Sequence, residues 1–189
     1  MRITLKLFLA LVLFALPFSG AMADEYDDTV KIFKNAGESG NFFGNSYGYA
    51  LFPTIGKGGI GIGAAHGSGR VYEQGKYVGD TKMNQVSIGL QLGGQAYSQV
   101  VFFQDKRSFD EFTSGNFEFS ADANAVAITA GASASASTGG SSAGASGGKN
   151  DATTAGKYHK GMAVFTVAKG GLMYQAAIAG QKYKYTPKK

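Results

Sequence analysis

Two short segments near the C-terminal end place lysines beside tyrosines: Lys157-Tyr158-His159-Lys160 and Lys182-Tyr183-Lys184-Tyr185. A lysine ammonium is a compact charge that suits phosphate, and a tyrosine ring sits well at a membrane interface with its hydroxyl in water. The pattern predicts interfacial tyrosines at positions 158, 183 and 185. The lysines predicted to contact lipid headgroups are Lys157, Lys160, Lys169, Lys182 and Lys184, with Lys31 and Lys34 as a second candidate patch.

Charge is distributed unevenly along the chain. Asp151 is the last acidic residue and seven lysines follow it, so residues 152–189 carry +7, whereas residues 24–151 carry −4. A block of one sign favours an anionic partner, such as a membrane surface or a phosphate-bearing ligand. A solvated end that only aids solubility explains the charge equally well. Nucleic acid is disfavoured as a partner, because the chain is weakly basic and Arg70 and Arg107 are its only arginines after position 2.

The glycine-rich stretch GKGGIGIGAAHGSGR, residues 56–70, contains a formal G-x-G-x-x-A pattern. A dinucleotide-binding loop needs a strand before it and a helix that opens on its last glycine. Here the glycines instead alternate with apolar residues at a period of two, and no helical pattern follows. The stretch therefore predicts a strand that runs into a turn, and it disfavours a phosphate loop.

No group of residues with the spacing of a catalytic or metal site stands out. His66 and His159 are 93 residues apart, and the chain has no cysteine. No G-x-S-x-G nucleophile elbow surrounds Ser68. The sequence therefore predicts a protein that is not an enzyme and that uses neither a cofactor nor a metal.

The elements that must position these residues begin after an N-terminal targeting segment. Residues 1–23 have the basic start, the apolar run and the A-x-A ending of a secretory signal peptide. We expect a secreted protein, periplasmic or peripheral on a membrane, whose mature chain begins at Asp24. Residues 24–46 predict an amphipathic helix and a linker, and residues 47–189 a β-rich domain.

The β-rich domain is expected to be α+β and mainly β, with an antiparallel, strongly curved sheet or a small barrel. Repeated glycines within strands permit bends and close packing. Asp105 and Gly115 are candidate caps of one interrupting helix, and alternation returns at residues 117–125. The Gly/Ala/Ser-rich segment 129–156 predicts a mobile loop. The glycines expected to be structural are Gly59, Gly61, Gly63, Gly67, Gly69, Gly89 and Gly93.

From Tyr47 to Tyr183 the chain resembles the SYLF lipid-binding domain. The resemblance rests on four glycine-bearing blocks in the order of that family: YALFP with GGIGIGAAHGSGRV, then VSIGLQLGGQAYSQVVFF, FDEFTSGNFEFSADA and AKGGLMYQAAIAG. It implies a β-rich domain that binds membrane phospholipids, with phosphoinositides as ligands of eukaryotic members. It further implies that a basic amphipathic N-terminal helix assists binding, and that some fungal relatives bind actin.

Together, the residues and the resemblance predict a secreted SYLF-like domain that binds anionic phospholipid without catalysis. The signal peptide disfavours actin as a partner, and no particular protein partner is predicted. One alternative is a small eight-stranded outer-membrane β-barrel, which the length, the signal peptide and the Gly/aromatic alternation permit. Another is an envelope protein with a structural or protein-binding role.

Overall fold

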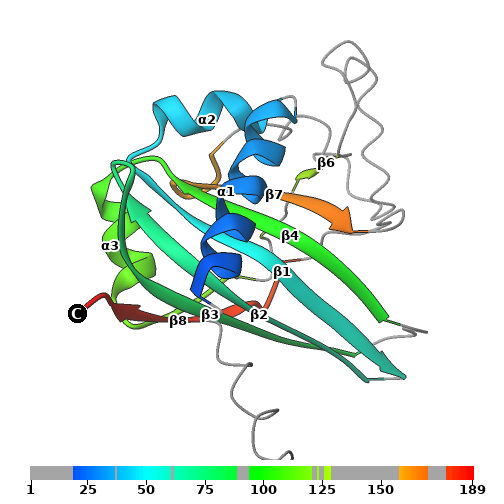
Figure 1. The fold of residues 1–189 in the computed structure, drawn as a ribbon. Coiled ribbons are helices and arrows are strands. Elements are labelled where there is room, and N and C mark those ends of the chain that lie inside the picture. Colours follow the sequence, from blue (N-terminus) through cyan, green and yellow to red (C-terminus); the bar gives the residue numbers. More distant parts are fainter. Residues whose placement is uncertain are drawn as a thin grey trace, which may run out of the picture.

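A computed structural model describes residues 19–36, 38–60, 62–88, 94–120, 123, 126–128, 158–169 and 178–189. In this part of the chain, eight strands form one sheet and three helices pack around it (Figure 1). The helices are α1 (Ser19–Asn35), α2 (Ser39–Asn45) and α3 (Lys106–Thr113). The strands are β1 (Gly48–Ile60), β2 (Ile62–Glu73), β3 (Lys76–Ile88), β4 (Gly94–Phe103), β5 (Asn116–Glu118), β6 (Val126–Ile128), β7 (Met162–Lys169) and β8 (Lys182–Pro187).

The sheet has the strand order β5-β8-β3-β2-β1-β4-β7-β6. All neighbouring strands are antiparallel except β6 and β7, which are parallel. Within the described residues β5 and β6 are not paired with each other, so the sheet is open. The prediction of a mainly β, antiparallel domain is confirmed. Of the two forms expected, a sheet or a small barrel, the described residues form an open sheet.

Each face of the sheet has its own apolar core, because successive side chains of a strand point to opposite faces. One core contains Leu51, Val100 and Phe165 and is covered by α1 and α2. The other core contains Ala50 and Val101, which are adjacent in sequence to Leu51 and Val100, and it is covered by α3. Strand β4 is buried along most of its length because helices cover both of its faces.

Helix α1 crosses the front of the sheet (Figure 1) and buries Tyr26 and Phe33 against it. The predicted amphipathic helix is therefore present. Where a linker was expected, the chain forms the second helix α2, whose Phe42 and Phe43 pack against Phe102 of β4. Aromatic packing against the sheet thus makes this short segment helical despite its glycines.

Helix α3 begins and ends where the sequence predicts. The Asp105 carboxylate accepts a hydrogen bond from the backbone N–H of Ser108 at 2.9 Å, and the Ser108 hydroxyl completes a capping box. Gly115 follows the helix with φ +125°, a backbone conformation that favours glycine. Phe109 and Phe112, on one side of the helix, are buried in the core of the α3 side.

The glycine-rich stretch at residues 56–70 is a hairpin, so the prediction of one strand followed by a turn is wrong. Strand β1 ends at Ile60 and β2 begins at Ile62, with these two residues opposite each other. The chain therefore reverses inside GGIGIG, and HGSGR lies in the middle of β2. The sequence pattern did not locate this reversal because alternation continues on both sides of it.

Two of the predicted structural glycines lie where a side chain has no room. A Cβ atom at Gly69 would lie 2.6 Å from the Leu51 carbonyl oxygen and 2.6 Å from the Phe52 ring. At Gly67 it would lie 2.6 Å from Cγ1 of Ile55. Phe52 and Ile55 flank a register shift between β1 and β4, and they lie over bare backbone of β2. Gly59 and Gly63 lie in the hairpin, and Gly61, Gly89 and Gly93 lie outside the described residues.

The predicted alternating strand at residues 117–125 is shorter than expected. Strand β5 ends at Glu118, and the backbone N–H of Ala123 donates a hydrogen bond to the Ser120 carbonyl, which marks a turn. Phe119 instead pairs through its backbone with Gly180 and Gln181 ahead of β8. The loop predicted at residues 129–156 lies outside the described residues.

Candidate functional site

Part of the α1 side of the sheet, on β2, β3 and β8, is not covered by the helices. Exposed side chains alternate along these strands, and register pairing places them on one face. We call this surface the exposed sheet face; it consists of Ile62, Ala64, His66, Ser68, Asp80, Lys82, Asn84, Val86, Lys182, Lys184 and Thr186. Arg70 continues the series on β2. Its guanidinium lies 4.2 Å from the ring centre of Tyr26 in α1, which identifies the side of the sheet.

Three lysines lie close together on the exposed sheet face. Lys82 of β3 is directly opposite Lys184 of β8, and Lys182 is opposite Asn84. The Lys182 ammonium lies 3.5 Å from a carboxylate oxygen of Glu118. In the described part of the chain, no carboxylate forms an ion pair with Lys82 or Lys184. Lys182 and Lys184 were predicted as headgroup contacts, whereas Lys82 was not.

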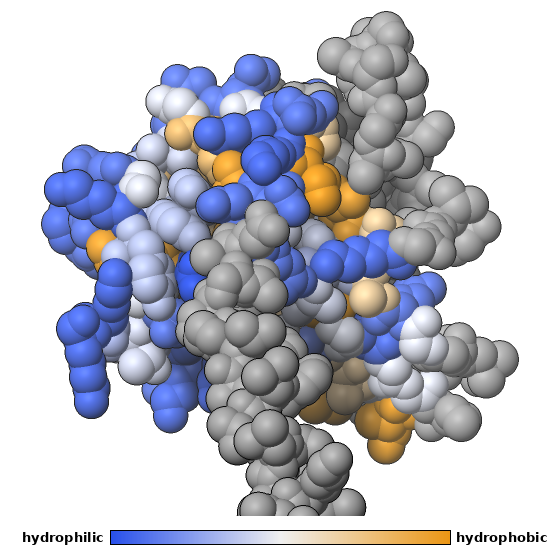
Figure 2. Space-filling view, viewed as in Figure 1, coloured by the Kyte–Doolittle hydropathy of each residue, from blue (hydrophilic) through white to orange (hydrophobic). Residues whose placement is uncertain are grey.

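The same face ends in exposed apolar side chains. Ile62 is 66% exposed and Val86 is 74% exposed, and Val86 lies opposite Ala64 in the register. Figure 1 shows β1, β2 and β3 extending past α1 to this end of the sheet, and Figure 2 shows apolar surface there. In β2, Ile62 thus faces outward, whereas Gly63, Gly67 and Gly69 face the core.

Lys169, at the end of β7, has a different environment from the one predicted. Its ammonium lies 2.6 Å from the Thr54 hydroxyl oxygen and 3.5 Å from a Glu25 carboxylate oxygen. Thr54 also donates a hydrogen bond to Glu25 at 2.8 Å. The three side chains connect the N-terminal half of α1 to β1 and β7, so Lys169 stabilises the docking of this helix.

The two lysines of the N-terminal patch lie on the solvent side of α1. Lys31 forms an exposed ion pair with Asp28 at 2.9 Å. The Lys34 ammonium lies 5.6 Å from the ring centre of Phe43 in α2. Both lysines are on the α1 side of the molecule, but they are not part of the exposed sheet face.

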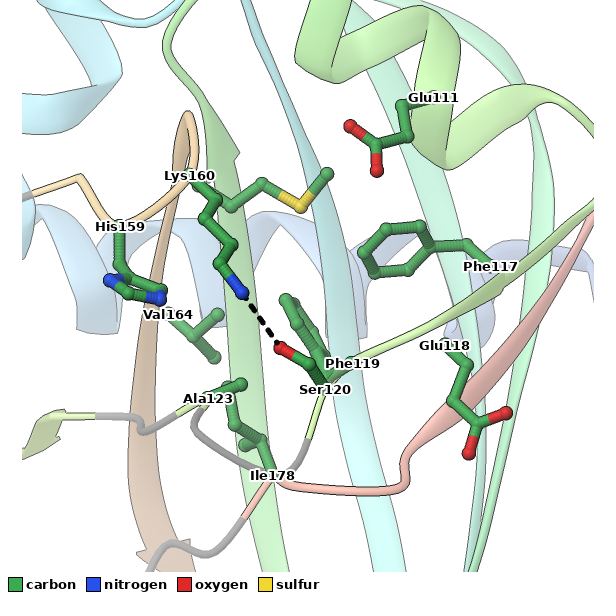
Figure 3. A pocket seen from close by; sticks show the side chains of 11 residues that line it. Glu111, Phe117, Glu118, Phe119, Ser120, Ala123, His159, Lys160, Val164 and Ile178 are labelled. Atoms are coloured by element: carbon green, nitrogen blue, oxygen red, sulfur yellow. Dashed lines mark hydrogen bonds between the residues drawn. The ribbon is translucent and has the colours of Figure 1, made fainter.

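Lys160 lies at a small cavity on the α3 side of the sheet. The cavity has a volume of about 200 Å³, and its apolar wall includes Phe119, Val164 and Ile178. The Lys160 ammonium lies 3.4 Å from the Ser120 hydroxyl oxygen (Figure 3). Lys160 is therefore on the opposite side of the sheet from Lys182 and Lys184. Lys157 lies outside the described residues.

The predicted interfacial tyrosines are partly or fully inside the protein. Tyr183 is buried, so its predicted contact with a membrane interface is wrong: on β8 it alternates with two exposed lysines and points into the core. Tyr185 is half-buried and donates a hydrogen bond to the Val78 carbonyl at 3.0 Å. Tyr158 is also half-buried, with its ring 5.1 Å from that of Phe42, and burial raises the pKa of its hydroxyl.

A buried polar cluster lies on the α3 side of the sheet, around Gln181. The Gln181 amide nitrogen lies 3.2 Å from the Tyr97 hydroxyl and 3.4 Å from the Gln85 amide oxygen. Gln99 donates to the Tyr183 hydroxyl at 2.7 Å and to the Gln181 amide oxygen at 3.1 Å. Burial raises the pKa of Tyr97 and Tyr183, so both hydroxyls stay protonated and donate or accept hydrogen bonds here. The cluster fastens the segment before β8 to the centre of the sheet.

The described residues contain no group of three or more His, Asp or Glu side chains arranged to hold a metal ion. Among these same residues, no helix combines the length and the apolar character needed to cross a bilayer. The chemistry that the exposed sheet face can supply is attraction of anions by lysine and contact with apolar material. The sequence signal for Lys82 was available in principle, because it alternates with Met83 in a strand, but its partner Lys184 is 102 residues away.

Comparison with known proteins identifies relatives of this chain. Residues 84–185 match the family Ysc84, described as Las17-binding protein actin regulator. A curated relative, "Beta cell expansion factor A" of Aeromonas veronii, is 28% identical over 158 residues. The alignment covers 82% of this chain and 51% of the relative, so the chain spans about half the length of that protein.

Proposed function

Since the chain belongs to the Ysc84 family, whose domain is the SYLF domain, we propose that it binds anionic phospholipid at a membrane surface through the exposed sheet face. The family is one of binding domains, and we assign no catalysis and no cofactor to this member. The observation that carries the proposal is the Lys82–Lys184 pair, with Lys182 on the same face.

The pair of opposite lysines is unfavourable for the isolated fold. Like charges directly opposite each other on neighbouring strands destabilise a sheet. An anion between the two ammonium groups removes this repulsion and adds attraction. Each lysine close to an anionic bilayer surface contributes about 1 kcal/mol, so Lys82 and Lys184 supply roughly 2 kcal/mol, and Lys182 adds less because it is paired with Glu118. This contribution is enough for reversible, peripheral binding.

The signal-peptide pattern at residues 1–23 supports a location of the proposed activity outside the cytoplasm. We therefore assign the protein to the periplasm, peripheral on a membrane. The target is then a phospholipid of the envelope and not actin. The lysines of α1 face the same side of the molecule and add a weaker, partly neutralised attraction, because Lys31 is paired with Asp28.

Flotation with vesicles tests the proposal. Purified protein is mixed with vesicles of phosphatidylcholine alone or of equal parts phosphatidylglycerol and phosphatidylcholine. The double variant Lys82→Gln/Lys184→Gln should bind the anionic vesicles about thirtyfold more weakly than the native protein, because two lysine contributions are lost. The double variant Lys76→Gln/Lys106→Gln removes the same charge at exposed positions away from this face, and it should bind as the native protein does.

Equal binding of native protein to neutral and anionic vesicles would contradict the proposal. So would equal weakening by both double variants, because the effect would then follow net charge and not this face. Circular dichroism of each variant checks that the sheet is intact. All four lysines are exposed, so we expect no loss of fold.

A further inference from the structure

We propose that the protein binds the bilayer end-on, with the shared end of β2 and β3 entering the acyl boundary and Ile62 and Val86 as the inserted side chains. This inference rests on the proposed function and names the part of the molecule that leaves water. It assigns a role to the glycine-rich hairpin, for which sequence patterns suggested only a scaffold.

The first argument is exposure. Ile62 and Val86 are 66% and 74% exposed, and among the described residues only Ile32, at 37%, joins them as a large exposed apolar side chain. Ile62 lies on β2 and Val86 on the neighbouring strand β3, on the same face of the sheet. Ala64, two residues after Ile62, is directly opposite Val86. Single exposed apolar residues are ordinary, but apolar side chains gathered at one end of a sheet indicate a surface that is covered in use.

The second argument is the spacing between apolar and basic side chains. A strand advances about 3.4 Å per residue, so the row of Asn84 and Lys182 lies about 7 Å from Val86. The row of Lys82 and Lys184 lies about 14 Å away. The headgroup layer of one leaflet is about 5–8 Å thick, from the difference between total and hydrocarbon thickness. With Val86 at the acyl boundary, Lys182 reaches headgroup phosphates, and the long side chains of Lys82 and Lys184 extend toward them.

The third argument is that backbone groups are paired up to the end of the hairpin. The β1–β2 register continues through Gly59 opposite Gly63 to Ile60 opposite Ile62. An apolar medium excludes strands whose N–H and C=O groups lack partners, so this pairing suits the hairpin for shallow entry. In the described sheet, β8 pairs with the outer edge of β3 only as far as Asn84, so Val86 stays at the hydrated acyl boundary and goes no deeper. A glycine at position 62 would add no apolar area to this end of the sheet, whereas the exposed Ile62 side chain does.

Charge selects a bilayer over a second copy of the chain as the occupant. A twofold contact between two exposed sheet faces brings the same patch of each copy together. Lys82, Lys182 and Lys184 would then lie near the lysine group of the other copy, which is repulsive. An anionic bilayer offers apolar material to the strand ends and phosphate to the lysines behind them.

The chain contains no tryptophan, so one substitution supplies a unique fluorescent probe. Ile62→Trp and Val86→Trp place it at the strand ends, and Lys76→Trp places it at the other end of β3. With vesicles of equal parts phosphatidylglycerol and phosphatidylcholine, the first two variants should shift their emission to the blue and be quenched by brominated acyl chains. The Lys76→Trp variant should do neither.

A second measurement uses affinity. Ile62→Ser/Val86→Ser should bind these vesicles about thirtyfold more weakly, because the apolar area of two side chains no longer leaves water. Ile32→Ser is the control, since it makes the same change at an exposed position of α1 and should bind as the native protein does.

The outcomes separate this inference from the proposed function. Vesicle binding without a blue shift at positions 62 and 86 would overturn end-on insertion and leave headgroup binding intact. A blue shift equally strong with phosphatidylcholine alone would support insertion and contradict the preference for anionic lipid. A blue shift that depends on protein concentration without vesicles would show a second copy covering the strand ends, and would overturn the inference. Absence of any vesicle binding would overturn both proposals.

Discussion

Polar side chains inside the protein are the most constrained feature at the scale of single residues. Gln85, Gln99 and Gln181 are buried together with Tyr97 and Tyr183, and their side chains hydrogen-bond to one another. A buried amide that loses its partner keeps the full penalty of leaving water. The cluster therefore makes the position of the segment before β8 specific, because any other placement breaks several hydrogen bonds at once.

Replacing the central residue of this cluster should destabilise the fold strongly. Gln181→Ala removes a partner from each of the four surrounding side chains, and we expect a loss of about 3 kcal/mol in the free energy of unfolding. Urea unfolding followed by circular dichroism measures it. Gln104→Ala, at an exposed position, should change the stability by less than about 0.5 kcal/mol. Similar values for the two variants would contradict the structural role of the cluster.

Buried tyrosines should make stability depend on alkaline pH. Burial raises the pKa of Tyr26 and of Tyr49 from 10.0 to about 12. A pKa that is higher in the folded state means that folding favours the neutral hydroxyl. The stability that each buried hydroxyl contributes to the folded state is complete below pH 10.0 and is lost as the pH rises toward about 12. We therefore expect alkaline unfolding in this range, accompanied by a cooperative increase in tyrosinate absorbance.

The variants Tyr26→Phe and Tyr49→Phe provide the control for this pH dependence. Each removes one ionisable hydroxyl and keeps the ring, so the alkaline midpoint should move to higher pH. An unchanged midpoint in both variants would mean that other groups control alkaline unfolding.

At the scale of elements, the close approach of β1 and β2 depends on missing side chains. Gly69→Ala puts a methyl group 2.6 Å from the Leu51 carbonyl oxygen, so we expect a loss of roughly 2–4 kcal/mol in stability. Gly56→Ala is the matched control in β1, because a Cβ atom there meets nothing within 4 Å. Thermal unfolding of the two variants distinguishes them. A Gly69→Ala protein as stable as Gly56→Ala would show that the strands can separate without penalty.

Elements with local signals were predictable, and elements decided by distant contacts were not. The caps Asp105 and Gly115 bound α3 because the hydrogen bonds that begin and end a helix come from adjacent residues. Helix α2 was missed because Phe42 and Phe43 stabilise it largely through rings far along the chain, Phe102 and Phe165 among them. The hairpin at Ile60 and Ile62 was missed because an alternating pattern is the same in one strand or in two.

At the scale of the whole molecule, the structure separates the lysines that the sequence grouped. Lys169 supports α1, Lys160 lies on the α3 side, and Lys182 and Lys184 join Lys82 on the exposed sheet face. The +7 block of residues 152–189 is therefore not one surface. Binding to an anionic bilayer should depend on the few lysines that share a face with apolar side chains.

Salt should weaken binding to anionic vesicles without abolishing it. The screening length falls from about 10 Å at 0.1 M salt to about 3 Å at 1 M, which removes most of the lysine contribution and leaves the apolar one. We expect affinity for equal parts phosphatidylglycerol and phosphatidylcholine to fall at least about thirtyfold over this range. The remaining binding should be lost in Ile62→Ser/Val86→Ser. Salt-independent binding of the native protein would contradict this account.

The sequence by itself determined the class of the domain, its amphipathic N-terminal helix, the capped helix α3 and the family to which the chain belongs. These features follow from periodicity, from capping residues and from blocks of adjacent residues, all of which are local along the chain. Only the tertiary structure decided which face of each alternating strand is covered. A period of two defines two faces but does not say which one a helix will bury. For this reason Tyr183 is inside, Ile62 and Val86 are outside, and Lys82 meets a lysine 102 residues away.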